Sequence, residues 1–311
     1  MKISVVMPCY NEEEVLPFTI KNISEYLDSL ILDSYIKDYE LVLVNDGSKD
    51  NTWKLIEEYA SNSNNIMGIK LSRNVGHQNA LLSGLFNARG DLMISIDADL
   101  QDDISVIKDM ILEYKNNACE IVYGVRKKRE SDTWFKKTSA EGFYKLMNLL
   151  GADIVFNHAD YRLMSRKTIE HLKEFEEVNL FLRGLVPLIG YKTSSVYYDR
   201  VERFAGESKY PLKKMLAFAW DGITSLSVVP LRLISSIGFI IFLISIFMTF
   251  WVLGIKFFSN DTVPGWASTV LPIYFIGGIQ LLSLGIIGEY IGKIYKETKR
   301  RPRYFIEKIL D

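Results

Sequence analysis

Short apolar runs alternate with amphipathic segments over the first 125 residues. Apolar residues at helical spacing occupy about residues 13–29, 52–61, 78–88 and 104–116. The runs before and after these segments are rich in β-branched residues and predict strands at Ile3–Met7, Leu41–Val44, Ile66–Leu71, Leu92–Ile96 and Glu120–Val125. This alternation predicts an α/β fold, a mostly parallel sheet with helices on both faces, whose ligands bind at the carboxyl ends of the strands.

Two long apolar runs follow near the C-terminus. Leu233–Phe258 carries a single charge, Lys256, and Trp266–Ile291 carries only Glu289. Each run exceeds the roughly 20 residues that a helix needs to cross a ~30 Å hydrocarbon core. Basic residues flank the pair but are absent from the turn between them, so both termini are expected in the cytoplasm. A buried hairpin in a soluble core is the alternative interpretation.

These patterns divide the chain into four parts. We expect a cytoplasmic domain at residues 1–210, an amphipathic interfacial helix at 211–230, two transmembrane helices within 231–292, and a basic cytoplasmic tail at 293–311. Residues 134–150 are also amphipathic, and for both amphipathic segments ordinary packing against the soluble domain is the alternative. The first apolar run is too short for a secretory signal, so the large domain is expected to stay in the cytoplasm, attached to the inner membrane.

Composition narrows the possible functions. The mean hydropathy of +0.07 and 48% hydrophobic residues agree with a lipid-facing part, and a formal net charge of -1 argues against a nucleic-acid partner. With two cysteines and three histidines, the chain offers no disulfide framework and no cysteine-rich metal site. Any metal ion would therefore be held mainly by oxygen ligands.

Polar clusters follow three of the predicted strands. Pro8–Glu12 follows the first strand, Asn45–Asp50 the second and Asp97–Asp102 the fourth, so all three should meet at one sheet edge. The loop after the first strand lacks glycine, which excludes the usual dinucleotide fingerprint. Plain turn chemistry is the alternative for the second cluster.

The third cluster carries a possible metal site. Asp97, Asp99 and Gln101 recur every second residue, so their oxygens can face one hard cation, Mg²⁺ or Mn²⁺. A D-x-D triplet by itself is more often a turn. Its position after an apolar strand and beside the other two clusters favours the metal site.

Together these segments resemble the GT-A fold glycosyltransferases of family 2, in particular the polyprenyl-phosphate sugar transferases, which include dolichol-phosphate mannose synthases and bactoprenol glucosyltransferases. The resemblance covers nearly the whole chain, and the paired C-terminal helices are similar to those of the bactoprenol branch. The segments that carry it are Val6–Glu12, Val44–Thr52, Leu71–Ala80, Asp97–Asp102, Ala159–Arg166, Gly206–Tyr210 and Gly288–Gly292.

The resemblance implies a role for several donor-side residues. It places the metal and the donor diphosphate at Asp97, Asp99 and Gln101. The residues implied to frame the nucleobase and ribose are Pro8, Tyr10, Glu12 and Asp46, and those implied to close over the donor phosphates are Arg203, Ser208 and Lys209.

On the acceptor side, the resemblance implies that Arg126 and Arg129 receive the acceptor phosphate, although a solvated charge run is the alternative. Asp160 is the implied catalytic base. A phosphate monoester is already largely ionised at neutral pH, because its second pKa is ~6, so Asp160 could instead orient the acceptor or the arginines.

Some positions depart from the family pattern. Asn45 stands where many relatives have a second Asp, and Asp103 and Ile104 replace a more frequent proline-containing pair. The pair His77 and Gln78 has no role that the pattern assigns.

The expected activity is the inverting transfer of a sugar, glucose from UDP-glucose, to a polyprenyl phosphate such as undecaprenyl phosphate. Alternatives are other donors (GDP-mannose, UDP-galactose or a UDP-N-acetylhexosamine), a glycan acceptor, and a non-catalytic membrane protein that binds nucleotide sugar. A homo-oligomer is also expected, since two helices leave much apolar surface exposed.

Overall fold

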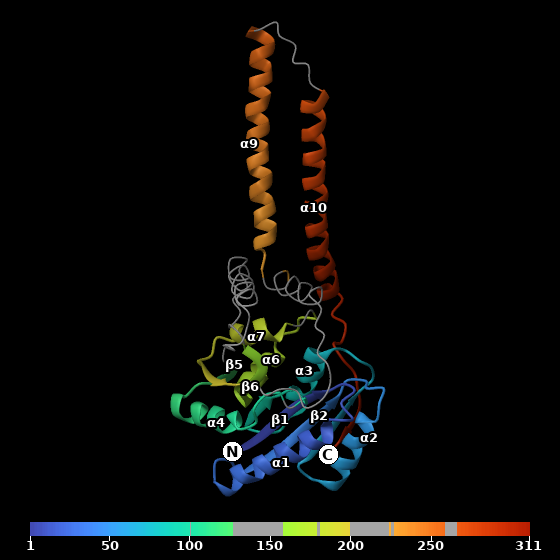
Figure 1. Ribbon diagram of the computed structural model, residues 1–311, viewed down its shortest axis with the longest axis vertical. Helices are drawn as coiled ribbons and strands as arrows, with labels where there is room; N and C mark the ends of the chain where they lie inside the picture. The colour runs from blue at the N-terminus through green and yellow to red at the C-terminus, as the bar shows by residue number, and fades with distance from the viewer. Residues whose placement is uncertain (100, 127–157, 179–180, 200–223, 225–226, 259–265) are drawn as a thin grey trace. The chain divides into compact units, whose positions relative to one another are not determined.

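The computed structural model describes residues 1–99, 101–126, 158–178, 181–199, 224, 227–258 and 266–311 (Figure 1). The described residues fall into two compact units. The first contains every described strand and includes Arg300–Asp311, and the second contains the two long C-terminal helices. The predicted interfacial segments at 134–150 and 211–230 lie largely outside the described residues.

The first unit alternates strands and helices, as the hydrophobic pattern predicts. In chain order, the elements of both units are β1 (Lys2–Cys9), α1 (Leu16–Leu32), β2 (Asp38–Asn45), α2 (Thr52–Asn62), β3 (Ile66–Leu71), α3 (His77–Asn87), β4 (Leu92–Ser95), α4 (Val106–Asn117), β5 (Ile121–Arg126), β6 (His158–Ser165), α6 (Arg166–Lys173), α7 (Leu182–Leu188), β7 (Thr193–Tyr198), α9 (Val229–Phe258), α10 (Trp266–Thr298) and β8 (Ile306–Leu310).

The strands form one mixed sheet in the order β7-β5-β6-β4-β1-β2-β3-β8. Pairing is parallel for β1 with β2, β1 with β4, β2 with β3 and β5 with β7. It is antiparallel for β4 with β6, β5 with β6 and β3 with β8. The prediction of an α/β sheet is confirmed, with more antiparallel pairing than expected, because β6 and β8 were not predicted.

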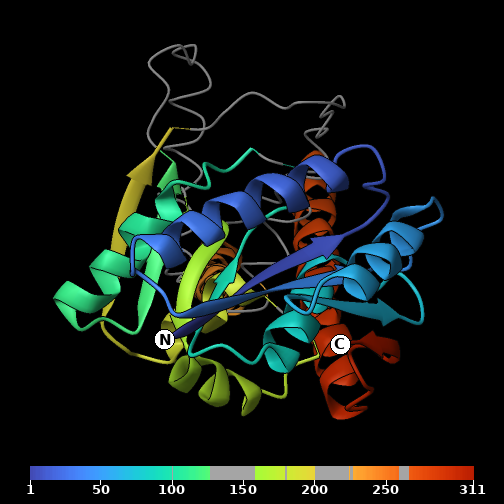
Figure 2. The same ribbon diagram turned by 90° about the horizontal axis from the view of Figure 1, so that it is seen from below.

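Helices cover both faces of this sheet, which explains why its central strands are buried on both sides. One apolar core lies under α1, α2 and α4, and includes Leu16 and Ile23 of α1. The other lies under α3, α6 and α7, and includes Leu82 of α3 and Leu172 of α6. Figure 2 shows α1 and α6 on opposite sides of the sheet.

The C-terminal tail returns to the sheet. β8 pairs with β3 at the sheet edge, where Ile309 lies opposite Ile69. Two ion pairs support this contact, from Lys70 to Glu307 at 2.7 Å and from Lys308 to Glu57 at 2.9 Å. The sequence analysis described this segment only as a basic tail, and five residues of it are a strand.

The second unit contains α9 and α10. Among the described residues, one helix segment, Phe275–Thr298 of α10, is long and apolar enough to cross a membrane. The structure extends α9 over 30 residues, but only Val229–Ile241 qualifies there, as a shorter apolar helix. The second membrane helix therefore remains a prediction.

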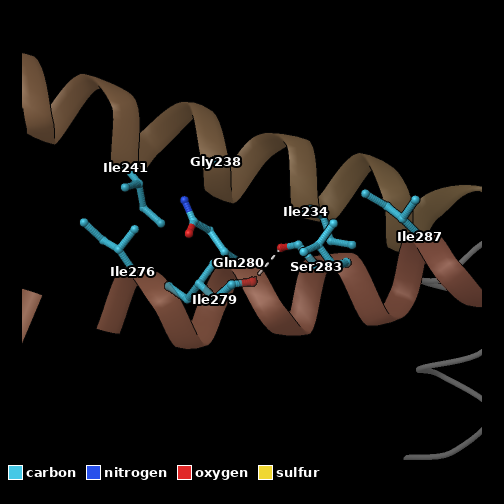
Figure 3. Close-up of a pocket in the computed structure, with 9 residues that line it drawn as sticks. Ile234, Gly238, Ile241, Ile276, Ile279, Gln280, Ser283 and Ile287 are labelled. Atoms are coloured by element: carbon cyan, nitrogen blue, oxygen red, sulfur yellow. Dashed lines mark hydrogen bonds between the residues drawn. The ribbon is translucent and has the colours of Figure 1, made fainter. Parts of the chain in front are cut away.

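A cavity of about 560 Å³ lies between α9 and α10. Isoleucine side chains from both helices line it, and Gln280 points from α10 toward α9 near Gly238 (Figure 3). Ser283 also lines the cavity, and its hydroxyl donates to the carbonyl of Ile279 at 2.8 Å.

Candidate active site

The sheet topology brings the predicted site residues together at one edge of the sheet, the one formed by the carboxyl ends of β1, β2 and β4. β1, β2 and β4 all run toward this edge, and the antiparallel strand β6 begins there. Ser95 of β4 pairs with Arg162 of β6, and extending this register by two residues places Asp97 opposite Asp160. These two residues are 63 positions apart in the chain, so the sheet brings them together.

Asp46 anchors the loop that follows β2. Its side chain is 3% exposed and accepts backbone hydrogen bonds from Val75 at 2.7 Å and Gly76 at 3.0 Å. Burial raises the pKa of Asp46, although these two N–H groups oppose the rise. Asp46 therefore fixes the loop before α3 in place beside the end of β2.

The same loop needs glycine at position 47. Gly47 has φ of +63°, and a Cβ there would come within 2.4 Å of the backbone nitrogen of Asn74. A side chain at this position would be both strained and obstructed. The close approach of the two loops therefore depends on Gly47.

The loop after β1 joins the loop after β2 through hydrogen bonds. The backbone N–H of Asn11 donates to the Ser48 hydroxyl at 3.0 Å, and the N–H of Glu12 donates to Thr52 at 2.8 Å. A cavity of about 500 Å³ opens here, lined by residues 11–15, Lys49 and Asp50. Pro8 is partly buried at the end of β1, and Tyr10 is 43% exposed beside it. The structure thus brings the four residues predicted to frame the nucleoside, Pro8, Tyr10, Glu12 and Asp46, to adjacent loops.

Asp97 lies in a cluster of negative charge. Burial, reinforced by Asp102, Asp160 and Asp99 and opposed by His77, raises its pKa to about 6. Carboxylates crowded in this way are stabilised by a cation, which removes their mutual repulsion.

Gln101 supplies a second observation about this cluster. Its side chain is 3% exposed, and its carbonyl oxygen Oε1 has no hydrogen-bond partner. A buried oxygen without a partner is costly, and a hard cation would satisfy it. Asp99 accepts from the Gln101 backbone at 3.2 Å. The predicted metal-binding residues thus fit a cation, although no group of three or more His, Cys, Asp or Glu side chains among the described residues is arranged to hold one.

Asp160 has the opposite environment. Arg162 Nη2 lies 2.6 Å from its Oδ1, and Arg183 Nη2 lies 3.2 Å from its Oδ2. Burial alone would raise the pKa of Asp160, but the two guanidinium groups hold it well below its usual range. Asp160 is therefore a stable carboxylate and a poor proton acceptor.

The two arginines were missed in the sequence analysis. Arg162 is two residues from Asp160 on β6 and so shares its face, a period-two relation that the sequence contains. Arg183 lies on α7, and nothing in the chain before folding relates it to Asp160.

His77 and Gln78 connect the parts of this edge. His77 Nε2 lies 3.6 Å from Asp97 Oδ1 and 3.7 Å from Asp160 Oδ2. The side-chain oxygen Oε1 of Gln78 accepts from the backbone N–H of Leu182 at 2.8 Å, which ties α7 to α3. The two residues to which the family pattern assigned no role thus lie within the candidate site, His77 beside both aspartates and Gln78 against α7.

Arg126 ends β5 and pairs with Asp102. Its Nη2 lies 2.9 Å from Asp102 Oδ1, which also accepts from the Tyr198 hydroxyl. Burial would lower the pKa of Arg126, but Asp102 and Tyr198 raise it overall. Arg129, Arg203, Ser208 and Lys209 lie outside the described residues.

Comparison with known proteins identifies the chain. Residues 4–173 match the family described as Glycosyl transferase family 2, which is more than half of the 311 residues. The chain belongs to glycosyl transferase family 2. The protein is thus a glycosyltransferase, and the resemblance deduced from its motifs is confirmed, with a GT-A-like mixed α/β sheet.

Relatives of this glycosyltransferase match it over almost its whole length. YkoT of Bacillus subtilis (strain 168), an uncharacterised glycosyltransferase, is 53% identical and covers 98% of this chain and 91% of its own. The prophage bactoprenol glucosyl transferase homolog of Escherichia coli (strain K12) is 40% identical and covers 99% of both. The bactoprenol glucosyl transferase of Shigella phage SfX is 41% identical and also covers 99% of both.

Proposed function

We propose that this glycosyltransferase transfers glucose from UDP-glucose to a polyprenyl phosphate, such as undecaprenyl phosphate, at the cytoplasmic face of the membrane. The observation that carries the proposal is the meeting of the Asp97 cluster with the Asp160 and arginine cluster at one sheet edge. Relatives named bactoprenol glucosyl transferase, 40–41% identical over nearly the full length, support the lipid acceptor.

The donor would bind across the loops after β1 and β2. The nucleoside would lie in the cavity near Tyr10, with Asp46 holding the loop beneath it. Its diphosphate would then point along the edge toward Asp97, because β1 and β4 are adjacent in the sheet.

Asp97, Asp99 and Gln101 would hold Mg²⁺ or Mn²⁺. When bound, the cation neutralises charge on the leaving nucleoside diphosphate. The raised pKa of Asp97 and the unpartnered oxygen of Gln101 support this assignment.

The acceptor phosphate would attack the anomeric carbon from the side opposite the diphosphate, which inverts that carbon. Its oxygen is ionised near neutral pH without help from the enzyme. Since Arg162 and Arg183 keep the pKa of Asp160 low, Asp160 would act by orientation and not as a base.

The C-terminal strand supports two membrane crossings. β8 follows α10 in the chain, yet it pairs with β3 in the sheet that contains β1. Because a bilayer would not divide such a sheet, the chain before α9 and after α10 would lie on one side, and the number of crossings would be even. Phe275–Thr298 accounts for one crossing, and α9, ~45 Å long at 1.5 Å per residue, would supply the other. The basic residues Arg300, Arg301 and Arg303 would place that side in the cytoplasm.

Release of nucleotide by the detergent-purified protein tests the proposal. UDP- and GDP-sugars are offered in turn with Mg²⁺ or Mn²⁺, with and without undecaprenyl phosphate. We expect release that requires both UDP-glucose and the lipid. Lipid-dependent release from another donor would correct the sugar, and release indifferent to the lipid would favour a glycan acceptor. Self-association remains a prediction, tested by the mass of the purified protein in detergent.

A further inference from the structure

Asp160 pairs with two arginines at once. Two guanidinium groups, from Arg162 and Arg183, contact this one carboxylate. Arg162 is only 1% exposed, so its charge is committed to the interior. The Arg183 side chain is 33% exposed, so its guanidinium is accessible from the surface of the site.

The order of residues along the sheet edge separates two sides. Asp46 follows β2, Asp97 follows β4 and Asp160 lies on β6, and these strands are arranged as β2-β1-β4-β6. If the nucleoside lies at β1 and β2 and the diphosphate at β4, the acceptor must approach from the β6 side. Arg183 is on this side, where it contacts Asp160.

Arg126, which the sequence analysis assigned to the acceptor phosphate, is engaged differently. Asp102 is 2% exposed and accepts from both Arg126 and Tyr198. If Arg126 moved onto a substrate, the buried carboxylate of Asp102 would lose its positively charged partner, which is unfavourable. Arg183 differs, because the carboxylate that it contacts, Asp160, is also paired with Arg162.

We propose that Arg183 binds the phosphate of the acceptor, with Asp160 and Arg162 holding its guanidinium in place. The assignment rests on the proposed function and adds a substrate-binding residue to it. The planar guanidinium can donate two parallel hydrogen bonds to a phosphate monoester, a geometry that lysine cannot reproduce. The hydrogen bond from the Leu182 backbone N–H to the Gln78 side chain sets the start of α7 and so the position of Arg183.

Steady-state kinetics of the full-length protein in detergent test this role. Arg183→Ala should raise the KM for undecaprenyl phosphate about tenfold to hundredfold, as expected for loss of a charge-assisted hydrogen bond. The KM for the nucleotide sugar and its slow hydrolysis without lipid should remain unchanged. The KM of Arg183→Lys for the lipid should lie between those of the wild type and Arg183→Ala. Arg89→Ala, which alters an exposed arginine paired with Asp311, should have the wild-type KM.

A double-mutant cycle separates substrate binding from support of Asp160. If Arg183 binds phosphate, Arg183→Ala should raise the acceptor KM further in an Asp160→Asn background. If Arg183 only holds Asp160, the second substitution should add nothing, and this result would overturn the inference.

Other outcomes are equally decisive. A rise in the donor KM equal to that for the lipid would assign Arg183 to the donor diphosphate and contradict the proposal. Absence of lipid-dependent turnover by the wild type would overturn the proposed function together with this inference. Lipid-dependent wild-type turnover with an unchanged acceptor KM in Arg183→Lys and Arg183→Ala would overturn only the inference. Thermal melting of each variant shows whether it is folded.

Discussion

Asp97, just after β4, and Asp160, on the neighbouring strand β6, lie close to the same histidine, but their electrostatic environments are opposite. Around Asp97, burial and three other carboxyl groups raise the pKa to about 6. Around Asp160, two arginines lower it well below its usual range despite burial. His77 lies within 3.7 Å of both carboxylates and is shared between them.

This difference indicates how the two sides of the site work. Among the described residues, the Asp97 side has more carboxyl groups than guanidinium groups, since only Arg126 pairs there with Asp102, and it is suited to a metal ion that accompanies the donor diphosphate. On the Asp160 side two guanidinium groups contact one carboxylate, and this side is suited to bind an anion directly. The enzyme would thus need a cation for the donor and none for the acceptor. Four predictions test this comparison.

Removing Asp99 should have the largest effect. Asp99→Ala takes one oxygen ligand from the cation, so transfer should fall about 10²–10³-fold, the range seen when one group that stabilises a leaving anion is lost. Binding of Mn²⁺, followed by electron paramagnetic resonance, should weaken in parallel. Asp109→Asn, an exposed carboxylate on α4, is the matched control and should bind Mn²⁺ like the wild type. Full turnover with EDTA present would refute the metal assignment.

Asp160→Asn should lower kcat about 10–100-fold at every pH. The pKa of Asp160 lies below the working range, so the residue is ionised throughout and contributes no limb to the pH profile. The acid limb should instead follow the acceptor phosphate near pH ~6, in the wild type and the variant alike. Measuring kcat from pH 5.5 to 8.5 decides the matter: a loss that shrinks as pH rises would restore Asp160 as a base.

Gly47→Ala should weaken donor binding without affecting the acceptor side. The new Cβ would lie 2.4 Å from the Asn74 backbone in a left-handed conformation, which costs about 1–3 kcal/mol through strain alone. Gly76→Ala is the matched control, because Gly76 also has positive φ but no atom within 4 Å of the added carbon. The donor KM and thermal stability should change more in Gly47→Ala. Equal effects would mean that backbone strain, and not the contact between the loops, is responsible.

Tyr198→Phe should have the smallest effect on activity. It removes the hydrogen bond to the buried Asp102 carboxylate, worth about 1.5–3 kcal/mol, and the 3.3 Å bond that the hydroxyl accepts from Arg126, while Arg126 remains paired with Asp102. The melting temperature should fall, and the acceptor KM should stay near the wild-type value. The neighbouring Tyr197 is 63% exposed, so Tyr197→Phe should leave the melting temperature unchanged. A large rise in acceptor KM for Tyr198→Phe would return Arg126 to the acceptor site.

Several features followed from local sequence. The strands β1 to β5 and helices α1 to α4 were predicted within a few residues of their observed bounds, because their apolar periodicity matches burial on a two-sided sheet. Asp97, Asp99 and Gln101 were predicted as a group because alternate residues after a strand share a direction, and their role stays a prediction. The loops with Asp46 and Glu12 were found because parallel strands end together.

Other features depend on contacts between distant segments. β8 is five residues long and contains two charged residues, so its sequence alone does not indicate a strand. It forms a strand because it pairs with the edge of β3. Arg126 was assigned to the acceptor phosphate from the family resemblance, and its pairing with Asp102 is visible only once the pairing of β5 with β7 has brought Arg126 and Tyr198 together.

The amino-acid sequence by itself determined the family, the α/β layers and the carboxylates at the strand ends, since each depends on spacing within a few residues. The tertiary structure alone decided which charges meet. The antiparallel register of β4 and β6 sets Asp97 opposite Asp160, and the docking of α7 on α3 brings Arg183 to it. Electrostatic energies vary with distance between groups in space, so the opposite pKa shifts of the two aspartates could arise only after folding.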